Sequence, residues 1–280
     1  MIKPKFLIVG AMKSATTTLF EDLATHPLIF APDQKEPRNL CSEIIMTDEG
    51  LRAYTKLFDQ AKPNQLAFEA STHYTMRPDH EYVAHRARSI LGDNLKVIYV
   101  VRDPVSRSIS HHAHAYAAGD CTANINEEIY RFKRLINYSK YYYQIEPWLT
   151  ALGKPNVFIL TQEYYVSNRR HAVGALQSFL GLKPCADLID AHWVGNSRAA
   201  LAQDTTVSRI FRSSSFYKSG IRPLLSPSVR GRWKRLLMKK VARPATEATA
   251  ETRAHIAAET REDIAQLEPY VRLKEPGGWV

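Results

Sequence analysis

The sequence predicts an α/β fold, in which a parallel sheet is flanked by helices and followed by a helical C-terminal extension. Short apolar runs alternate with amphipathic helical segments, which is typical of a parallel sheet. The runs are apolar throughout, as expected for strands that are buried on both faces. The predicted strands are Phe6–Val9, Leu66–Phe68, Val97–Val101 and Val157–Leu160. The predicted helices are Thr17–Thr25, Pro78–Leu91, Pro104–Ala118, Asn126–Leu152 and Arg169–Leu180.

The chain is long enough, at 280 residues, for one large α/β domain with an extension. We expect a single domain over residues 1–280, with an α/β core at 1–190 and a basic, helical cap at 191–280. The sequence becomes rich in Ser and Arg after about Asp190, and helical patterns return at Pro227–Val241 and Thr246–Leu267. The segment Ala242–Ala245, which contains Pro244, separates these two predicted helices.

Composition limits the class of protein. The hydrophobic share of 45% and the charged share of 24% are ordinary for a soluble globular chain. No run approaches the ~20 apolar residues of a membrane span, and the first apolar stretch is too short for a signal peptide. Cys41, Cys121 and Cys185 are odd in number and widely spaced, which argues against disulfides and zinc. We therefore expect a cytoplasmic protein.

The net charge of +10 is concentrated late in the chain. Eleven Lys or Arg residues and no Asp or Glu lie between Thr205 and Arg243. Such a stretch could bind nucleic acid, an anionic lipid or an anionic ligand. An equally weighted interpretation is a solvated helical face.

The first predicted strand leads into a loop that suits an anion. The strand ends at Gly10, and the loop that follows carries Lys13 and several hydroxyl side chains before a helix begins. Backbone N–H groups at a helix N-terminus attract anions, and Lys and hydroxyl groups add charge and donors. The loop is not a Walker A motif, because Ala15 and Thr16 occupy the positions of its second glycine and its lysine. We expect the loop to bind a phosphate or sulfate ester.

A second anion motif follows the strand Val97–Val101. Arg102 emerges at the carboxyl end of this strand, Asp103 and Pro104 open a helix, and Ser110 lies eight residues after Arg102. Ligands of open α/β sheets bind outside the carboxyl ends of the strands, where both motifs would lie. Arg102 can bind a phosphate bidentately, although it could instead pair with a carboxylate. A Walker B strand would deliver a magnesium-binding Asp here, so Arg102 argues against an NTPase.

At these motifs the chain resembles the sulfotransferases that use 3′-phosphoadenosine 5′-phosphosulfate (PAPS), in particular the heparan-sulfate-type and bacterial carbohydrate branch. The similar segments are KFLIVGAMKSATTTL, VIYVVRDPVSRSISHH and APDQKEPRNL. The resemblance implies a P-loop-like fold, PAPS as donor, PAP as product and no metal. It assigns the 5′-phosphosulfate to Lys13, Ser14, Ala15, Thr16, Thr17 and Thr18. It assigns the 3′-phosphate to Arg102 and Ser110, with Asn196, Ser197 and Arg198 completing the nucleotide site.

The resemblance also implies catalytic roles. Lys13 would stabilise the negative charge that grows on the leaving phosphate oxygen. Glu36, in the matched Lys-Glu-Pro segment, would be the general base that takes the acceptor proton. Without the resemblance, Glu36 would be interpreted as an exposed loop carboxylate.

One segment departs from the family pattern. The family often has Glu-Lys-Ser/Thr-Pro after the next strand, whereas this chain has Glu69, Ala70, Ser71 and Thr72. The family lysine is therefore absent, and acceptor specificity cannot be transferred. Acceptor contacts are expected instead from Glu69, His73 and Tyr74.

A group of histidines and a group of tyrosines can each be interpreted as structural or as functional. His111, His112 and His114 could suggest a metal site, but no neighbouring acid or cysteine completes a ligand set, so surface or cleft-lining histidines are favoured. The tyrosines Tyr138, Tyr141, Tyr142 and Tyr143 are more often packing residues, although tyrosines also stack on sugars.

The expected function is transfer of a sulfuryl group from PAPS to a hydroxyl, or an amine, of a carbohydrate or glycosylated natural product. The absence of an evident anchor favours a bacterial enzyme over a Golgi enzyme, and no nucleic-acid partner is expected. The alternatives are an NTP-dependent small-molecule kinase and a basic protein that binds nucleic acid or a membrane surface. The sequence does not fix the oligomeric state.

Overall fold

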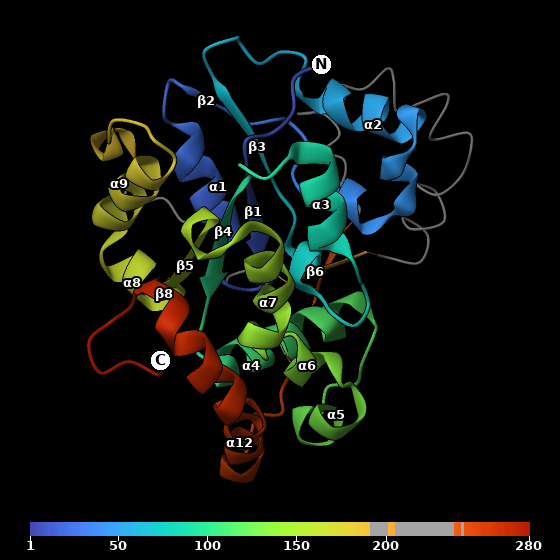
Figure 1. Cartoon of the computed structure of the whole chain (residues 1–280). Helices are drawn as coiled ribbons and strands as arrows, with labels where there is room; N and C mark the ends of the chain where they lie inside the picture. The colour runs from blue at the N-terminus through green and yellow to red at the C-terminus, as the bar shows by residue number, and fades with distance from the viewer. Residues whose placement is uncertain (191–200, 205–237, 242–243) are drawn as a thin grey trace.

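A six-stranded parallel sheet forms the centre of the molecule (Figure 1). The computed structural model describes residues 1–190, 201–204, 238–241 and 244–280. The strand order is β2-β3-β1-β4-β5-β8, which confirms the predicted α/β class. The strands are β1 (Phe6–Gly10), β2 (Ile29–Phe30), β3 (Leu66–Ala70), β4 (Lys96–Val101), β5 (Val157–Thr161) and β8 (Val271–Leu273).

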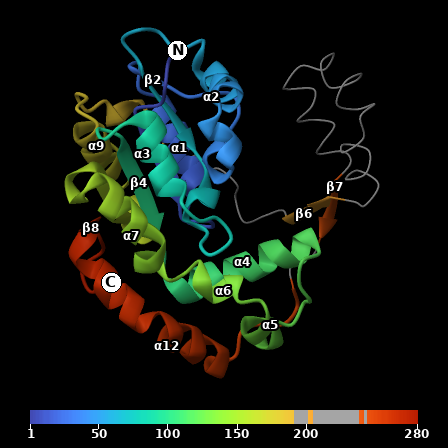
Figure 2. The same cartoon turned by 45° about the vertical axis from the view of Figure 1, so that its right-hand side comes forward.

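Helices cover both faces of this sheet (Figures 1 and 2). Those of the first 190 residues are α1 (Thr16–Ala24), α2 (Asp48–Thr55), α3 (Val83–Leu91), α4 (Pro104–Ala118), α5 (Ile125–Arg131), α6 (Arg134–Asn137), α7 (Tyr141–Leu152), α8 (Gln162–Ser167) and α9 (Arg169–Phe179). The helix α12 (Ala250–Leu267) follows near the C-terminus. A separate antiparallel pair joins β6 (Leu201–Asp204) to β7 (Met238–Val241).

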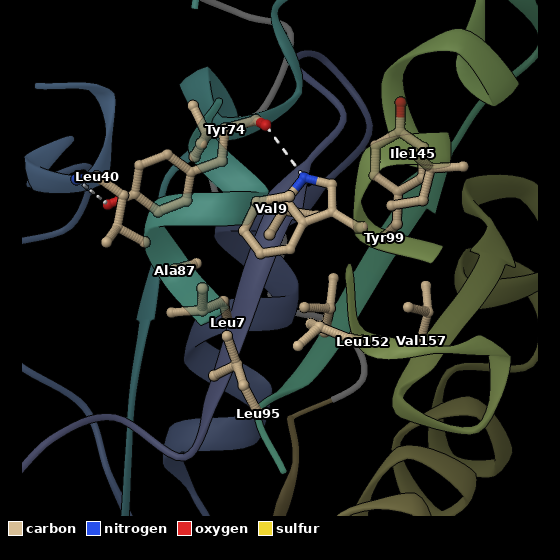
Figure 3. Packing of buried hydrophobic residues seen from close by; sticks show 14 of the residues in the cluster. Leu7, Val9, Leu40, Tyr74, Ala87, Leu95, Tyr99, Ile145, Leu152 and Val157 are labelled. Carbon is tan, nitrogen blue, oxygen red and sulfur yellow. Dashed lines mark hydrogen bonds between the residues drawn. The ribbon is translucent and has the colours of Figure 1, made fainter. Parts of the chain in front are cut away.

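The period-two alternation of β1 divides the core into two layers. Leu7 and Val9 belong to the cluster that contains Trp148 of α7 (Figure 3). Phe6 and Ile8 face the opposite layer, which contains residues of α1 and α9. Every residue of β1 is buried, as the uninterrupted apolar run predicts for a sheet covered on both sides.

The long helix predicted over Asn126–Leu152 is wrong. The chain forms α5, α6 and α7 instead, and leaves helical geometry at Phe132, with ψ of 77°, and at Lys140, with ψ of 80°. Asp263 of α12 stabilises the second break, because its two carboxylate oxygens accept the N–H groups of Tyr142 and Tyr143, each at 2.8 Å. This contact comes from more than a hundred residues away, so local sequence could not predict it.

The C-terminal region also differs from the prediction. Residues 238–241 of the helix predicted at Pro227–Val241 form the strand β7, and residues 227–237 lie outside the described part. The last predicted helix is present as α12, and the hydroxyl of Thr249 caps its first turn by accepting the Thr252 N–H at 3.2 Å. The chain then returns to the sheet, where β8 adds a parallel strand beside β5. Within the described residues, no helix has the length and apolar character needed to cross a membrane.

A buried ion pair ties α1 to α9. Arg169 donates from Nε and Nη2 to the carboxylate of Asp22, at 2.7 and 2.6 Å, and the Tyr165 hydroxyl donates to the same carboxylate at 2.5 Å. The two charged side chains are only 7% and 4% exposed. Breaking such a pair leaves an uncompensated buried charge.

We predict that Arg169→Ala lowers the free energy of unfolding by about 3–5 kcal/mol, because Asp22 is left buried without its partner. The exposed pair between Arg88 and Asp93 provides the control, and Arg88→Ala should cost less than about 1 kcal/mol. Urea denaturation followed by circular dichroism measures both. An equal decrease in the free energy of unfolding for the two variants would show that the buried pair stabilises the fold no more than the exposed pair does.

Candidate active site

The first anion loop runs from the end of β1 to the start of α1. The Ala11 N–H donates to the Val100 carbonyl at 2.6 Å, so the loop begins anchored to the neighbouring strand β4. Gly10 permits a close approach there, since a Cβ at this position would lie 2.1 Å from the Thr75 hydroxyl oxygen. Lys13 and Ala15 have φ of 70° and 60°, which turns the backbone sharply before α1 begins.

The start of α1 has the features of an anion cradle. Ala15 occupies the N-cap and provides no side-chain cap, and the first turn contains no acidic residue. The first N–H groups of a helix have no partner within the helix. The Ser14 side chain is fully buried, and its hydroxyl makes no hydrogen bond to any described residue. An uncapped helix start and an orphaned buried hydroxyl fit a bound phosphate or sulfate group.

The two predicted anion motifs meet at Lys13. The Arg102 Nη1 donates to the Lys13 carbonyl at 3.2 Å, which joins the loop after β1 to the end of β4. Burial lowers the pKa of Lys13, and the charges of Arg102 and Arg107 lower it further. Ser110 lies half-buried on α4, two turns beyond Arg102. The structure therefore brings together Lys13 and Arg102 as the sequence predicts.

Arg107 is a third cation of this region and was not identified from the sequence. Its guanidinium is fully buried and bonds neutral groups: Ser139 Oγ at 2.5 Å, the Leu135 carbonyl at 2.6 Å and His111 Nδ1 at 3.5 Å. Burial lowers the pKa of Arg107, and Arg102 contributes to the lowering. A signal was present in the sequence, because Arg107 follows Arg102 by five residues in the same motif.

Glu36 lies beside the end of β3. Its N–H donates to the Ala70 carbonyl at 2.9 Å, and its Oε2 accepts the Thr72 N–H at 2.9 Å and lies 3.4 Å from His73 Nδ1. Burial alone would raise the pKa of Glu36, but the His73 contact, the Lys35 charge and the Thr72 N–H together lower it. The side chain remains 26% exposed, so this carboxylate is ionised and accessible.

Lys35 connects the two parts of the site, and sequence reasoning did not assign it a role. Its Nζ donates to the Thr17 hydroxyl of α1 at 3.0 Å and lies 3.4 Å from Glu36 Oε1. One ammonium group therefore spans the distance between the anion loop and the carboxylate. The only sequence signal was its position immediately before Glu36.

The three predicted acceptor residues have different environments. His73 is partly exposed and lies against Glu36. Glu69 is 0% exposed within β3, and Tyr74 is 2% exposed within the 3-10 helix η4 (Thr72–Thr75) that follows this strand. Burial raises the pKa of Glu69 to about 8, against the lowering effect of the Tyr74 and Tyr54 hydroxyls. Neither Glu69 nor Tyr74 reaches the surface, and we do not retain them as acceptor contacts.

His111, His112, Tyr138 and Tyr141 are buried, so the prediction of surface or cleft-lining histidines holds only for the exposed His114. The Tyr141 hydroxyl donates to the Arg102 carbonyl at 2.6 Å, and Tyr138 bonds Asp79 while its ring stacks on His111 at 5.5 Å. Among the described residues, no group of three or more His, Cys, Asp or Glu side chains could hold a metal ion. The predicted nucleotide residues Asn196, Ser197 and Arg198 lie outside the described residues, as does most of the basic stretch Thr205–Arg243.

Comparisons with known proteins find relatives among the sulfotransferases. The chain is 27% identical over 204 residues to human heparan sulfate glucosamine 3-O-sulfotransferase 6, a match that covers 69% of this chain and 56% of that protein. It is 35% identical over 112 residues to the membrane-associated sulfotransferase kil1 of Dictyostelium discoideum, covering 39% and 22% of the two chains. The chain thus spans about half the length of the human relative.

Solved structures share the fold. A sulfotransferase from Alicyclobacillus acidocaldarius superimposes with a TM-score of 0.63 at 20% identity, covering 98% of both chains. The sulfotransferase domain from the curacin biosynthetic pathway gives 0.56 at 16% identity, covering 98% of this chain and 99% of that domain. The model of the sulfotransferase domain family matches residues 3–256. The chain therefore belongs to the sulfotransferase family, whose donor is PAPS and whose nucleotide product is PAP.

Proposed function

We propose that the protein transfers a sulfuryl group from PAPS to a hydroxyl, or an amine, of a carbohydrate or glycosylated natural product. The observation that carries this proposal is the convergence of Lys13, Arg102 and Glu36 at one edge of the sheet. Arg102 bonds the Lys13 carbonyl, and Lys35 bridges Thr17 and Glu36. The proposed donor site and the proposed general base are therefore close to each other.

The donor end of the site is cationic and rich in hydrogen-bond donors. We assign the 5′-phosphosulfate to the loop and the start of α1, and the 3′-phosphate to Arg102 and Ser110. The uncapped N-terminus of α1 and the buried Ser14 hydroxyl suit the first anion. Arg102 and Arg107 lower the pKa of Lys13, and Arg102 also lowers that of Arg107, so this cluster suits a ligand that carries several negative charges.

Lys13 is proposed to stabilise the departing group. PAPS supplies an activated sulfuryl group whose leaving group is a phosphate oxygen. A fixed ammonium stabilises charge that develops on this oxygen more strongly in the transition state than in the ground state. Partial burial of Lys13 strengthens that electrostatic effect, because surrounding water screens it less.

Glu36 is proposed to accept the proton of the acceptor group. Its lowered pKa keeps the carboxylate ionised, and its contacts with Thr72 and His73 fix its orientation. Lys35 lies on the other carboxylate oxygen and also contacts the anion loop. We propose that this ammonium lies next to the sulfuryl group as it moves between donor and acceptor.

The acceptor class rests on the relatives. The human relative is named for a glucosamine unit of heparan sulfate, and we propose a carbohydrate acceptor for this chain by analogy. His73, partly exposed beside Glu36, is the candidate acceptor contact. Incubation with labelled PAPS and a panel of heparosan oligosaccharides, glycosides and simple phenols would test this class, and label in phenols alone would contradict it.

A cytoplasmic, bacterial setting is part of the proposal. Cys41, Cys121 and Cys185 are all free, which suits a reducing compartment. Redox-sensitive mass mapping of the three thiols in native lysate would test this point, since stable oxidation of all three would contradict it.

Glu36→Gln should reduce kcat by at least about 100-fold, the lower range for removal of a general base. The amide keeps the shape of the side chain, so PAP affinity should stay within about twofold if Glu36 acts on the acceptor. Steady-state kinetics and calorimetric titration with PAP measure the two effects. Loss of PAP binding in this variant would identify Glu36 as a structural or donor-binding residue.

The pH profile should report the lowered pKa of Glu36. Activity requires the carboxylate, so kcat/KM should fall only as the pH drops through the lowered pKa of Glu36. His73→Ala removes a contact that lowers this pKa, so the acidic limb should move to higher pH. His85→Ala on the exposed side of α3 is the control and should leave the limb in place. An unchanged acidic limb in His73→Ala would show that His73 does not lower the pKa of the general base.

Arg102→Ala should weaken PAP binding by about 2 kcal/mol or more, in line with loss of a charge-assisted hydrogen bond at a partly desolvated site. Calorimetric titrations with PAP, ADP and Mg-ATP on this variant and on wild type provide the test, and Arg88→Ala is the matched surface control. Metal-independent PAP binding that only Arg102→Ala loses supports the donor site. Binding of Mg-ATP in preference to PAP would instead favour a kinase.

A further inference from the structure

The C-terminal end of the chain contacts the motif that contains Arg102. After α12 and β8, the indole Nε1 of Trp279 donates to Glu163 Oε2 of α8 at 3.1 Å. The indole ring also packs against Tyr141 of α7, with ring centroids 5.8 Å apart. Figure 1 shows the C-terminus next to β8 and α8, on the side of the sheet where α7 lies.

Glu163 connects Trp279 to the start of α4. Its second oxygen, Oε1, accepts the Asp103 N–H at 3.0 Å. Asp103 in turn caps α4, because its Oδ1 accepts the Ser106 N–H at 2.7 Å. The carboxylate of Glu163 therefore uses one oxygen for Trp279 and the other for the residue that follows Arg102.

Tyr141 also bonds the backbone of Arg102. The buried Tyr141 hydroxyl donates to the Arg102 carbonyl at 2.6 Å, and the hydroxyl oxygen accepts the Arg102 N–H at 3.4 Å. Trp279 touches both groups that fix the backbone around Arg102, namely Glu163 by a hydrogen bond and Tyr141 by its ring.

We propose that Trp279 is a positioning residue for the 3′-phosphate part of the donor site. By fixing Glu163 and Tyr141, it holds the backbone of Arg102 and Asp103 in the geometry that directs the guanidinium toward the ligand. This inference rests on the proposed assignment of the 3′-phosphate to Arg102. Trp279 itself touches no ligand in this scheme, so it acts through its neighbours.

The test compares two nucleotides that differ only in the 3′-phosphate. Calorimetric titration of Trp279→Ala should show PAP affinity reduced about tenfold, the factor that corresponds to about one net hydrogen bond. Affinity for AMP, which lacks the 3′-phosphate, should fall by a clearly smaller factor, because this support acts on the 5′ site only indirectly, through the hydrogen bond from Arg102 to the Lys13 carbonyl. A general structural role would weaken both nucleotides alike.

Two conservative variants make the test independent of any folding defect in Trp279→Ala. Trp279→Phe keeps the ring against Tyr141 but removes the N–H, so about a threefold loss for PAP is expected, part of the full effect. Glu163→Gln has a single accepting oxygen in place of two, so it must lose either the Trp279 or the Asp103 contact. Tyr270→Leu is the matched control, because Tyr270 packs the same C-terminal segment onto Tyr142 without touching Glu163 or Tyr141.

The outcomes separate this inference from the proposed function. If Arg102→Ala loses PAP affinity while Trp279→Phe and Glu163→Gln keep the wild-type preference for PAP over AMP, the inference is wrong and the donor site stands. If Arg102→Ala keeps full PAP affinity, the assignment of the 3′-phosphate to Arg102 is wrong, and the inference about Trp279 is wrong as well. A reduced preference in the Trp279 and Glu163 variants, with an unchanged preference in Tyr270→Leu, supports the inference.

Discussion

The hydrogen bond from Arg102 to the Lys13 carbonyl is the contact on which the site depends. The two residues follow β1 and β4, which are parallel neighbours in the sheet, so their carboxyl ends reach the same edge. The contact brings the Arg102 guanidinium to the backbone of Lys13, and the charges of Arg102 and buried Arg107 lower the pKa of Lys13. Like charges that lie close together raise each other's electrostatic energy, and added negative charge lowers it. An anionic donor offsets that cost, which makes its binding free energy and the stability of the loop interdependent.

The acceptor side is organised by the backbone as much as by side chains. Glu36 and Arg38 both have positive φ, at 58° and 61°, and such conformations persist only when surrounding contacts enforce them. The Ala70 carbonyl and the Ser71 hydroxyl accept the N–H groups of these two residues, at 2.9 and 3.2 Å. The end of β3 therefore sets the position of the proposed base. Since Ala70 interacts here through its carbonyl, this support does not require the lysine side chain that the family often has at that position.

The sequence predicted the parts of the site that depend on local pattern. The strand–loop–helix around Lys13 and the strand–helix around Arg102 are each contiguous in the sequence, and their residue types predict anion binding. The tertiary features were not predictable in this way. The breaks at Phe132 and Lys140 depend on contacts from other elements, such as Asp263 of α12. Glu69 is buried within β3, which lies between β2 and β1 in the sheet, and the bridge made by Lys35 requires two segments that only the folded sheet brings together.

The C-terminal region is bound to the core at several points, and this bears on how the donor site is built. Asp263 accepts the first free N–H groups of α7, and α7 carries the Tyr141 hydroxyl that bonds the Arg102 carbonyl. β8 extends the sheet beyond β5, and the residues after it bring Trp279 to Glu163. A helix without its own side-chain cap, as α7 is at Lys140, depends on such an external acceptor for a defined start. The position of Tyr141, and through it the backbone of Arg102, is therefore determined by residues near the opposite end of the chain from Lys13.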